Sequence, residues 1–250
     1  MSNYSKPTIS IITVVYNGAK TLRATIESIT PQLTDDIEYI IIDGGSNDGT
    51  QDIIQSYAHH LAYWTSEPDN GIYDAWNKAL AQASGRYIGF VGADDVLLPN
   101  TLAVYLNGIH KQPEVDYWSS RIAFGKINGR IIGQPWRWKR FRRYMCVAHV
   151  GSLHSRNLYE RFGLYDTSYR IAGDYDFLLR SGSTLKAGFI DIVSAVMGDG
   201  GVSNRAVSLA LEETARAKIR HKATSVAVAR IDQLLAQLKV AIRSRLTRKP

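Results

Sequence analysis

Residues 8–17 read Thr-Ile-Ser-Ile-Ile-Thr-Val-Val-Tyr-Asn, a β-branched and almost continuously apolar stretch that ends at Tyr16 and Asn17. A strand that is covered by helices on both faces of a parallel sheet has this composition. Apolar residues at helical spacing follow over 19–32, and a second apolar run occupies 37–42. The stretch and its surroundings therefore predict a strand, a helix and a second, parallel strand.

The alternation of strands and helices continues to about residue 98. The pattern predicts helices over 50–58 and 72–83, and strands over 61–65 and 87–91. Strands that alternate with helices in this way form a sheet with right-handed crossovers, with helices on both faces. We therefore expect an α/β fold, with a Rossmann-like, mixed and mainly parallel sheet flanked by helices.

The pattern changes after Asp95. Over this half it predicts helices at 99–110, 155–162 and 174–181, a hairpin over 115–133 that turns at Asn128-Gly129, and a strand at 188–193. Beyond residue 204 there are no strand signals, and one or two terminal helices are expected. We expect one domain over 1–204, with halves 1–98 and 99–204, and a basic helical tail over 205–250.

Composition excludes several classes of protein. The 250 residues are 45% hydrophobic and 21% charged, which is typical of a globular protein and not of a disordered or repetitive one. The single cysteine, Cys146, excludes an internal disulfide and a zinc site of several thiolates. The polar start and the absence of about 18 consecutive apolar residues predict neither a signal peptide nor a spanning helix. We expect a cytoplasmic protein.

The positive charge is concentrated in the tail. Residues 205–250 hold 11 Lys and Arg against 3 Asp and Glu, whereas residues 1–204 hold 19 against 20. A near-neutral body argues against a nucleic-acid partner. The tail has apolar residues at helical spacing, followed or flanked by basic ones: Ile231, Leu234, Leu235, Leu238 and Ile242, with Lys239, Arg243, Arg245, Arg248 and Lys249. Two interpretations stay open: peripheral binding to anionic lipid at the inner face of the plasma membrane, or packing on the body with a solvated basic end.

Polar clusters follow three of the predicted strands. They are Tyr16-Asn17, residues 43–50 and residues 92–95. Because ligands bind beyond the carboxyl ends of parallel strands, these clusters are candidates for one binding edge. Each cluster alone is equally compatible with a turn in which Asp48 or Thr50 caps a helix.

Asp94 and Asp95 give the sharper chemical signal. Adjacent carboxylates at the end of an apolar strand repel each other unless a cation or hydrogen-bond donors lie between them. A Mg²⁺ or Mn²⁺ ion takes one or two carboxylates and completes its shell with water and phosphate oxygens, so a diphosphate ligand is expected. The chain has no GxxxxGK[ST] loop and no GxGxxG after a strand, which disfavours a P-loop protein and a dehydrogenase.

Together these strings resemble family 2 glycosyltransferases with a GT-A fold. The matching segments are 10–17, 42–50, 66–78, 85–95 and 172–180, and they occur in the order of the family. The 66–78 segment, Ser-Glu-Pro-Asp-Asn-Gly-Ile-Tyr-Asp-Ala-Trp-Asn-Lys, resembles the subset that builds bacterial surface polysaccharides of the colanic acid and capsule type. The resemblance covers residues 8 to about 181.

The resemblance implies roles for individual residues. Tyr16 and Asp43 match positions that hold the nucleotide base. Asp94 and Asp95 match the end of the family's Asp-x-Asp motif, with Asp95 implied as the direct metal ligand and Asp94 near the ribose or the metal. The chain departs from this motif at Gly92, where the family has its first Asp. Asp174 matches the catalytic base.

A mechanism and partners follow from this match. It implies an inverting, metal-dependent transferase that moves a sugar from a nucleotide-diphosphate sugar to a glycan or lipid-linked glycan, with a UDP-sugar as the commonest donor in the family. A carboxylate base must deprotonate the acceptor hydroxyl. The residue preceding Asp174 is Gly173, where the family's acidic pair has a Glu. The alternative is an inactive GT-A scaffold that binds partners through its basic tail.

Three further positions share one face of the helix predicted over 72–83. Asp74, Asn77 and Lys78 lie there by spacing, and the N-terminus of this helix near Gly71 is suited to a diphosphate. The alternative is a solvated helix face with an N-terminal cap.

The segment 136–144 interleaves Trp, Phe and Tyr with Arg and Lys. Three interpretations are open: the segment binds single-stranded nucleic acid, it binds the diphosphate of a lipid-linked acceptor at a membrane surface, or it is a strand or loop with one solvent-exposed face. We favour the second. His149 and His154 lie in a segment that resembles the acceptor side of the family, although a lone His is more often structural. Asp176 is a weaker candidate for the base, because it faces away from Asp174 on a helix.

Overall fold

A parallel sheet forms the first half of the molecule, as the alternating pattern predicts. The computed structural model describes residues 6–198, 200 and 206–247. Four strands run parallel in the order β3-β2-β1-β4: β1 (Ile9–Val15), β2 (Ile37–Asp43), β3 (Tyr63–Ser66) and β4 (Tyr87–Phe90). This part of the expected fold is confirmed.

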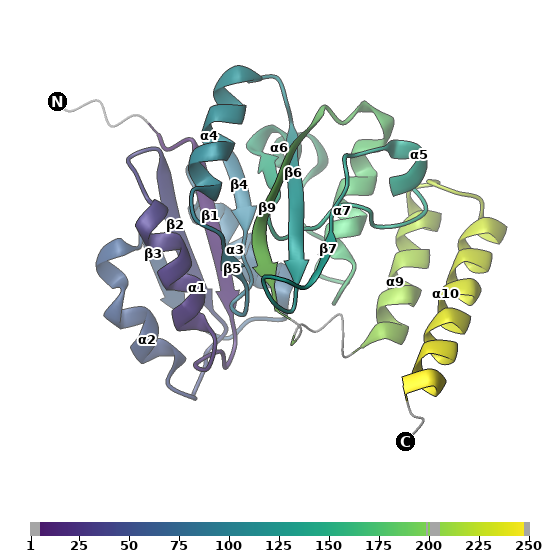
Figure 1. Ribbon diagram of the computed structural model, residues 1–250, viewed down its shortest axis with the longest axis horizontal. Coiled ribbons are helices and arrows are strands. Elements are labelled where there is room, and N and C mark those ends of the chain that lie inside the picture. Colours follow the sequence, from purple (N-terminus) through teal and green to yellow (C-terminus); the bar gives the residue numbers. More distant parts are fainter. Residues whose placement is uncertain (1–5, 199, 201–205, 248–250) are drawn as a thin grey trace.

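Side chains alternate between the two faces of β1 and β2, and each face buries its own apolar cluster. Ile11 and Ile41 contribute to the cluster on one face, and Ile12 and Ile42 to the cluster on the other. The first cluster includes residues of α1 (Leu22–Ile29), α2 (Thr50–Ser56) and α4 (Thr101–Lys111). The second includes residues of α3 (Ile72–Gln82), α6 (Arg156–Phe162) and α7 (Gly173–Ser181). Helices therefore cover both faces of the sheet (Figure 1).

The second half of the sheet is mixed. Its strands are β5 (Val96–Leu97), β6 (Tyr117–Phe124), β7 (Arg130–Ile132), β8 (Leu153–Ser155) and β9 (Ala187–Met197). The strand order continues from β4 as β8-β6-β9-β5, and β7 pairs with β6 as the predicted antiparallel hairpin. β8 pairs antiparallel with both β4 and β6, and β9 runs parallel to β6. The sequence pattern did not predict β5 and β8, which are too short to show a period.

Short helices complete the described chain: α5 (Trp138–Phe141), η1 (Thr30–Gln32), η2 (Ala58–His60) and η3 (Gly182–Thr184). Two longer ones, α9 (Val207–Arg220) and α10 (Val226–Thr247), end it. α9 packs on α7 and α10 packs on α9, so α10 is the outermost helix (Figure 1). In the part of the chain that the structure describes, none of the helices combines the length and hydrophobicity needed to span a bilayer.

Parts of the predicted tail cannot be compared with the structure. The proposed boundary at residues 204 and 205, and the basic positions Arg243, Arg245, Arg248 and Lys249, lie outside the residues whose side chains are described.

Candidate active site

The three polar clusters that follow strands meet at one edge of the sheet. The backbone N–H of Asn17, after β1, donates to the hydroxyl of Ser46, after β2, at 2.7 Å. The N–H of Ala19 donates to the carboxylate of Asp48 at 3.1 Å. The third cluster adjoins the first, because a Cβ atom at Gly18 would lie 3.6 Å from that of Ala93. The predicted convergence is confirmed.

Asp43 organises the loop after β2. It is fully buried, and its carboxylate accepts hydrogen bonds from the Ser46 N–H at 2.9 Å and from the Ser46 and Ser66 hydroxyls at 2.5 Å each. A carboxylate with this many donors is fixed in place. Its predicted contact with the nucleotide base remains a prediction, since the loop itself already occupies both carboxylate oxygens.

Tyr16 and Asp69 stand together beside Gly44. The Tyr16 ring is 67% exposed, which is unusual for an aromatic side chain that follows a buried strand. A Cβ atom at Gly44 would lie 3.4 Å from this ring on one side and 2.5 Å from the Asp69 carboxylate on the other. An exposed ring beside a carboxylate can stack on a planar base and accept its N–H groups. Sequence reasoning gave Asp69 no role, although it lies within the 66–78 segment.

The adjacent carboxylates of Asp94 and Asp95 have different surroundings. Asp95 is 3% exposed and accepts the backbone N–H groups of Gly92 and Gly198, each at 2.9 Å. Burial, with a contribution from the Asp94 charge, raises the pKa of Asp95 to about 6. Asp94 is half-buried, and no hydrogen bond from the described residues reaches its carboxylate. Asp95 therefore fixes the loop, and Asp94 presents the freer oxygens.

Gly92 lies directly beside the Asp95 carboxylate. A Cβ atom at residue 92 would lie 2.6 Å from an oxygen of Asp95 and 3.3 Å from an oxygen of Asp94. No side chain fits there without displacing a carboxylate. The absence of a side chain at residue 92 leaves room for the observed position of the Asp95 carboxylate, and it does not by itself indicate a lost site.

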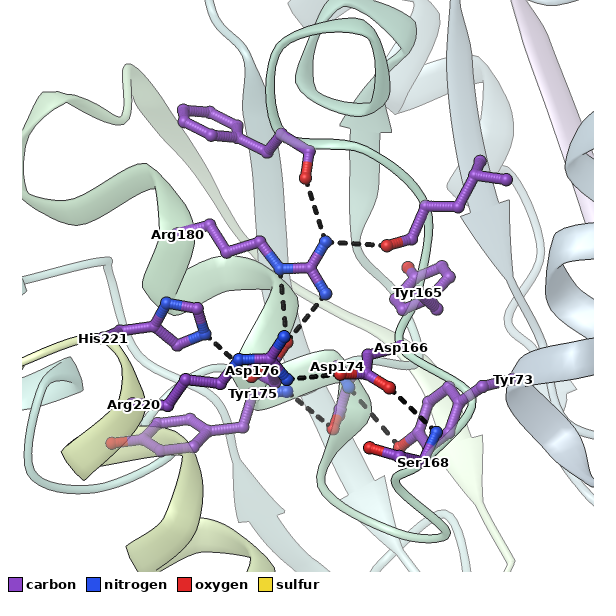
Figure 2. A network of polar contacts seen from close by, with 12 residues as sticks. Tyr73, Tyr165, Asp166, Ser168, Asp174, Tyr175, Asp176, Arg180, Arg220 and His221 are labelled. Carbon is purple, nitrogen blue, oxygen red and sulfur yellow. Dashed lines mark hydrogen bonds and ion pairs between the residues drawn. The ribbon is translucent and has the colours of Figure 1, made fainter.

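Asp174 lies in the first turn of α7. Its carboxylate accepts the N–H of Tyr175 at 2.8 Å, and its own N–H donates to the Tyr73 hydroxyl at 3.4 Å (Figure 2). Burial, to which the Glu213 charge adds, raises the pKa of Asp174 to about 6. A carboxylate with this pKa is ionised at neutral pH and is a stronger base than an exposed Asp. The surroundings fit the predicted role of general base.

Two residues from distant helices hold the chain in front of Asp174. Tyr73, in the first turn of α3, donates to the carbonyl of Ile171 at 2.6 Å. Glu213, from α9, is 5% exposed and accepts the N–H groups of residues 170, 171 and 172 at 2.8, 2.8 and 2.9 Å. The Tyr73 ring also explains Gly173, where a Cβ atom would lie 2.7 Å from it. Sequence reasoning missed Glu213, because the site lies 39 positions away from it along the chain.

The three candidate residues on α3 have partners within the protein. Asp74 accepts the N–H of Asn70 at 2.9 Å. The Asn77 amide donates to the Tyr165 carbonyl at 2.9 Å and accepts the Tyr165 N–H at 3.0 Å. Lys78 donates to the Pro68 carbonyl at 2.9 Å and pairs with Glu67 at 3.0 Å. The face is therefore not simply solvated, and no side chain of the described residues caps the helix: its polar groups tie α3 to neighbouring loops. Direct contact with a diphosphate remains a prediction.

Asp176 belongs to a separate polar network (Figure 2). It is fully buried and pairs with Arg180 at 2.7 Å and His221 at 2.8 Å. Although burial alone would raise it, the hydrogen bonds from His221 and Arg180 hold the pKa of Asp176 below its ordinary value. The network joins α7 to α9. Asp176 is therefore an anchor, as its predicted direction away from Asp174 suggested.

His149 and His154 lie inside an aromatic cluster. Their ring centroids are 5.4 Å apart, and His149 stacks on Trp76 at 4.6 Å. All four ring nitrogens are buried without a hydrogen-bond partner among the described residues. Burial lowers the pKa of His149 to about 3, and burial together with His149 lowers the pKa of His154. Both rings are neutral and buried among aromatic side chains, which fits the structural interpretation; contact with substrate or metal remains a prediction.

The 136–144 segment is partly core and partly surface. Phe141 is fully buried, and Trp136 packs on it with ring centroids 4.1 Å apart. Lys139, Arg140 and Arg142 are exposed. The aromatic residues at its start therefore anchor a basic surface, and are not free to stack along a nucleic-acid strand.

Solved structures share this fold. TarS of S. aureus superimposes with a TM-score of 0.69 at 18% identity, over 84% of this chain and 66% of that chain. The chain thus spans slightly less than two thirds of that TarS chain. The mannosyltransferase PcManGT from Pyrobaculum calidifontis gives a TM-score of 0.62 at 18% identity, over 95% and 76% of the two chains. The fold is that of GT-A glycosyltransferases.

Sequence comparison narrows this class to a family. The model of glycosyl transferase family 2 matches residues 10–160, and the chain belongs to this family. A PGL/p-HBAD biosynthesis glycosyltransferase of Mycobacterium tuberculosis is 33% identical over 214 residues, which are 80% of this chain and 81% of that protein. An uncharacterized glycosyltransferase of the same species is 33% identical over 185 residues, covering 71% and 70%. The chain is a family 2 glycosyltransferase.

Proposed function

We propose that this protein transfers a sugar from a nucleotide-diphosphate sugar to a hydroxyl of a glycan or lipid-linked glycan, with inversion, in the biosynthesis of a cell-surface polysaccharide. The observation that carries the proposal is Asp174, a carboxylate of raised pKa that Tyr73 connects to the helix following β3. Asp174 would take the proton of the acceptor hydroxyl as that oxygen attacks the anomeric carbon. A single direct displacement of the nucleoside diphosphate inverts the configuration.

The donor end has support from the exposed Tyr16 ring and from Asp69 beside it. TarS has been solved with UDP-GlcNAc, and PcManGT with GDP-Man and Mn²⁺. UDP-GlcNAc and GDP-Man are both nucleotide-diphosphate sugars. We propose UDP as the first nucleotide to test and GDP as the second.

The residues present fit a divalent cation, Mg²⁺ or Mn²⁺. In the described part of the chain no three His, Cys, Asp or Glu side chains gather, so protein groups alone do not complete a coordination shell. Asp94 supplies accessible oxygens while Asp95 holds the loop, and diphosphate oxygens and water would fill the remaining positions. When bound, the cation would neutralise charge that develops on the leaving diphosphate.

The acceptor and the place of the reaction are also proposals. The PGL/p-HBAD biosynthesis relative points to a cell-surface glycan as the product. We propose that the protein works in the cytoplasm, at the inner face of the plasma membrane, where a lipid-linked acceptor would be available.

Calorimetric titration with UDP, GDP and dTDP, each with and without Mn²⁺, tests the donor class. We expect one nucleotide to bind in a metal-dependent way, and Asp94→Ala to weaken that binding more than Asn107→Ala, an exposed residue of α4. If no nucleotide binds under any metal condition, the transferase proposal is wrong, and the inactive-scaffold alternative takes its place.

A further inference from the structure

The last helix, α10, turns its apolar face away from the protein. Five side chains at helical spacing are between 49% and 64% exposed: Ile231, Leu234, Leu235, Leu238 and Ile242. The residues that pack inward are Ala229 and Asp232, which lie about 160° and about 100° around the helix axis from the centre of this face. The helix does pack on the body, through α9, but these five apolar residues do not make the contact. Within the described chain, nothing covers them.

Two ion pairs of the buried Asp232 carboxylate, one of them with the buried Lys218, fix α10 in this orientation. The Asp232 carboxylate is 3% exposed, accepts a hydrogen bond from Lys218 of α9 at 3.1 Å, and pairs with Arg143 of the 136–144 segment. Lys218 is also only 3% exposed. Rotating α10 to bury its leucines would pull these charges apart in a poorly solvated place, which is strongly unfavourable. The outward direction of the apolar face is thus built into the packing.

The charges around the apolar face are basic. On α10, up to Ile242, the exposed charged residues are Arg230 and Lys239, which flank the face on either side. The one acidic residue there, Asp232, is buried. Arg143 brings the 139–145 stretch next to the same helix. This stretch adds the exposed Lys139, Arg140 and Arg142, together with Tyr144 and Met145, which are 48% and 37% exposed.

We propose that α10 and residues 139–145 form one docking face for an anionic lipid bilayer. An apolar strip flanked by cations matches a membrane surface, where acyl chains lie just below anionic headgroups. A second copy of this chain is the competing occupant, and the lipid-free oligomeric state distinguishes it from a bilayer. The face extends the proposed function by carrying the enzyme to a lipid-linked acceptor, and lipid binding is measurable without any sugar transfer.

Sedimentation with lipid vesicles tests this face. Vesicles of phosphatidylcholine are compared with vesicles of equal parts phosphatidylcholine and phosphatidylglycerol, without nucleotide. We expect the full chain to bind the anionic vesicles, and the double variant Leu234→Ser with Leu238→Ser to bind at least tenfold more weakly. Arg230→Gln with Lys239→Gln should weaken binding to anionic vesicles and reduce its salt dependence.

Matched controls separate this effect from misfolding. Ile127 and Leu164 are 60% and 53% exposed and lie outside the face, so Ile127→Ser and Leu164→Ser should bind vesicles like the wild type. Nucleotide binding by each variant reports on whether that variant is folded. If the proposed function is wrong, the wild type also fails to bind nucleotide, whereas vesicle binding is measured separately. Equal vesicle binding by wild type and Leu234→Ser with Leu238→Ser would overturn the proposal. So would a lipid-free dimer that this double variant dissociates, since α10 would then join two copies.

Discussion

At the scale of single residues, two carboxylates two positions apart receive opposite roles from their surroundings. Burial raises the pKa of Asp174 to about 6, whereas His221 and Arg180 hold the pKa of Asp176 low against the effect of its burial. Environments that push pKa values apart in this way distinguish a candidate general base from a carboxylate held in ion pairs. Asp174 is the carboxylate that can take up a proton near neutral pH.

The first prediction concerns the pH dependence of transfer. Because Asp174 must be ionised to act as base, kcat/KM should rise with pH through about 6 and become level above it. Asp174→Asn should lower kcat by about 10²- to 10⁴-fold while nucleotide affinity stays unchanged. Steady-state kinetics across pH measure both effects. Asp191→Asn, an exposed carboxylate on β9, is the control and should behave as wild type; full activity of Asp174→Asn would contradict the assignment.

Glu213 is a positioning residue that acts through the backbone in front of Asp174. Glu213→Gln removes one of the two acceptor oxygens and the negative charge that helps to raise the pKa of Asp174. We expect kcat to fall by about 10- to 100-fold through misplacement of the base, with the acidic limb of kcat/KM moving to lower pH. The neighbouring exposed Glu212 provides the matched control, Glu212→Gln. A loss of activity with an unmoved pH profile would indicate a purely structural role.

At the scale of elements, α3 connects several parts of the site. Its first turn carries Tyr73, which contacts the segment before Asp174, and its middle carries Asn77, which binds the backbone of Tyr165. Lys78 reaches back to the loop after β3. One helix thus connects the loop after β3 with the segments beside Tyr165 and Asp174. Its sequence alone had left open whether this face binds a diphosphate or is solvated.

Asn77→Ala distinguishes these two roles. The substitution removes both hydrogen bonds to Tyr165, so the free energy of unfolding should fall by about 1–3 kcal/mol. Urea denaturation measures this loss, and calorimetry of the folded variant should show wild-type nucleotide affinity. Unchanged stability with weakened nucleotide binding would instead make Asn77 a ligand of the diphosphate.

At the scale of the whole molecule, the active site costs stability. Asp174 has a pKa near 6 in the folded protein against 3.8 for the unperturbed group. The folded state therefore binds more protons between these values, and the free energy of unfolding falls as pH rises through this window.

Asp174→Asn should remove this cost. Above pH 6 the variant is expected to be more stable than the wild type by about 1–3 kcal/mol, and below pH 3.8 the difference should vanish. Thermal or urea unfolding at several pH values measures it. Asp191→Asn should show no such gain. If Asp174→Asn is less stable than the wild type above pH 6, burial of the ionised Asp174 carboxylate does not cost stability.

The sequence determined much of this protein without reference to the folded chain. The apolar run at 8–15, the hairpin at 115–133 and the segments that match the family are local patterns, so the parallel half of the sheet and the site's edge could be predicted from them. β5 and β8 could not, because strands of two and three residues acquire their pairing from β9, β4 and β6.

Only the tertiary structure decided which candidate groups are held by the protein and which are exposed. Asp95 accepts N–H groups while Asp94 stays open, Glu213 reaches the base from another helix, and α10 turns its leucines outward. The physical reason is the same in each case. Burial, hydrogen-bond partners and pKa values depend on residues distant in the chain, whereas strand and helix periods depend on neighbours.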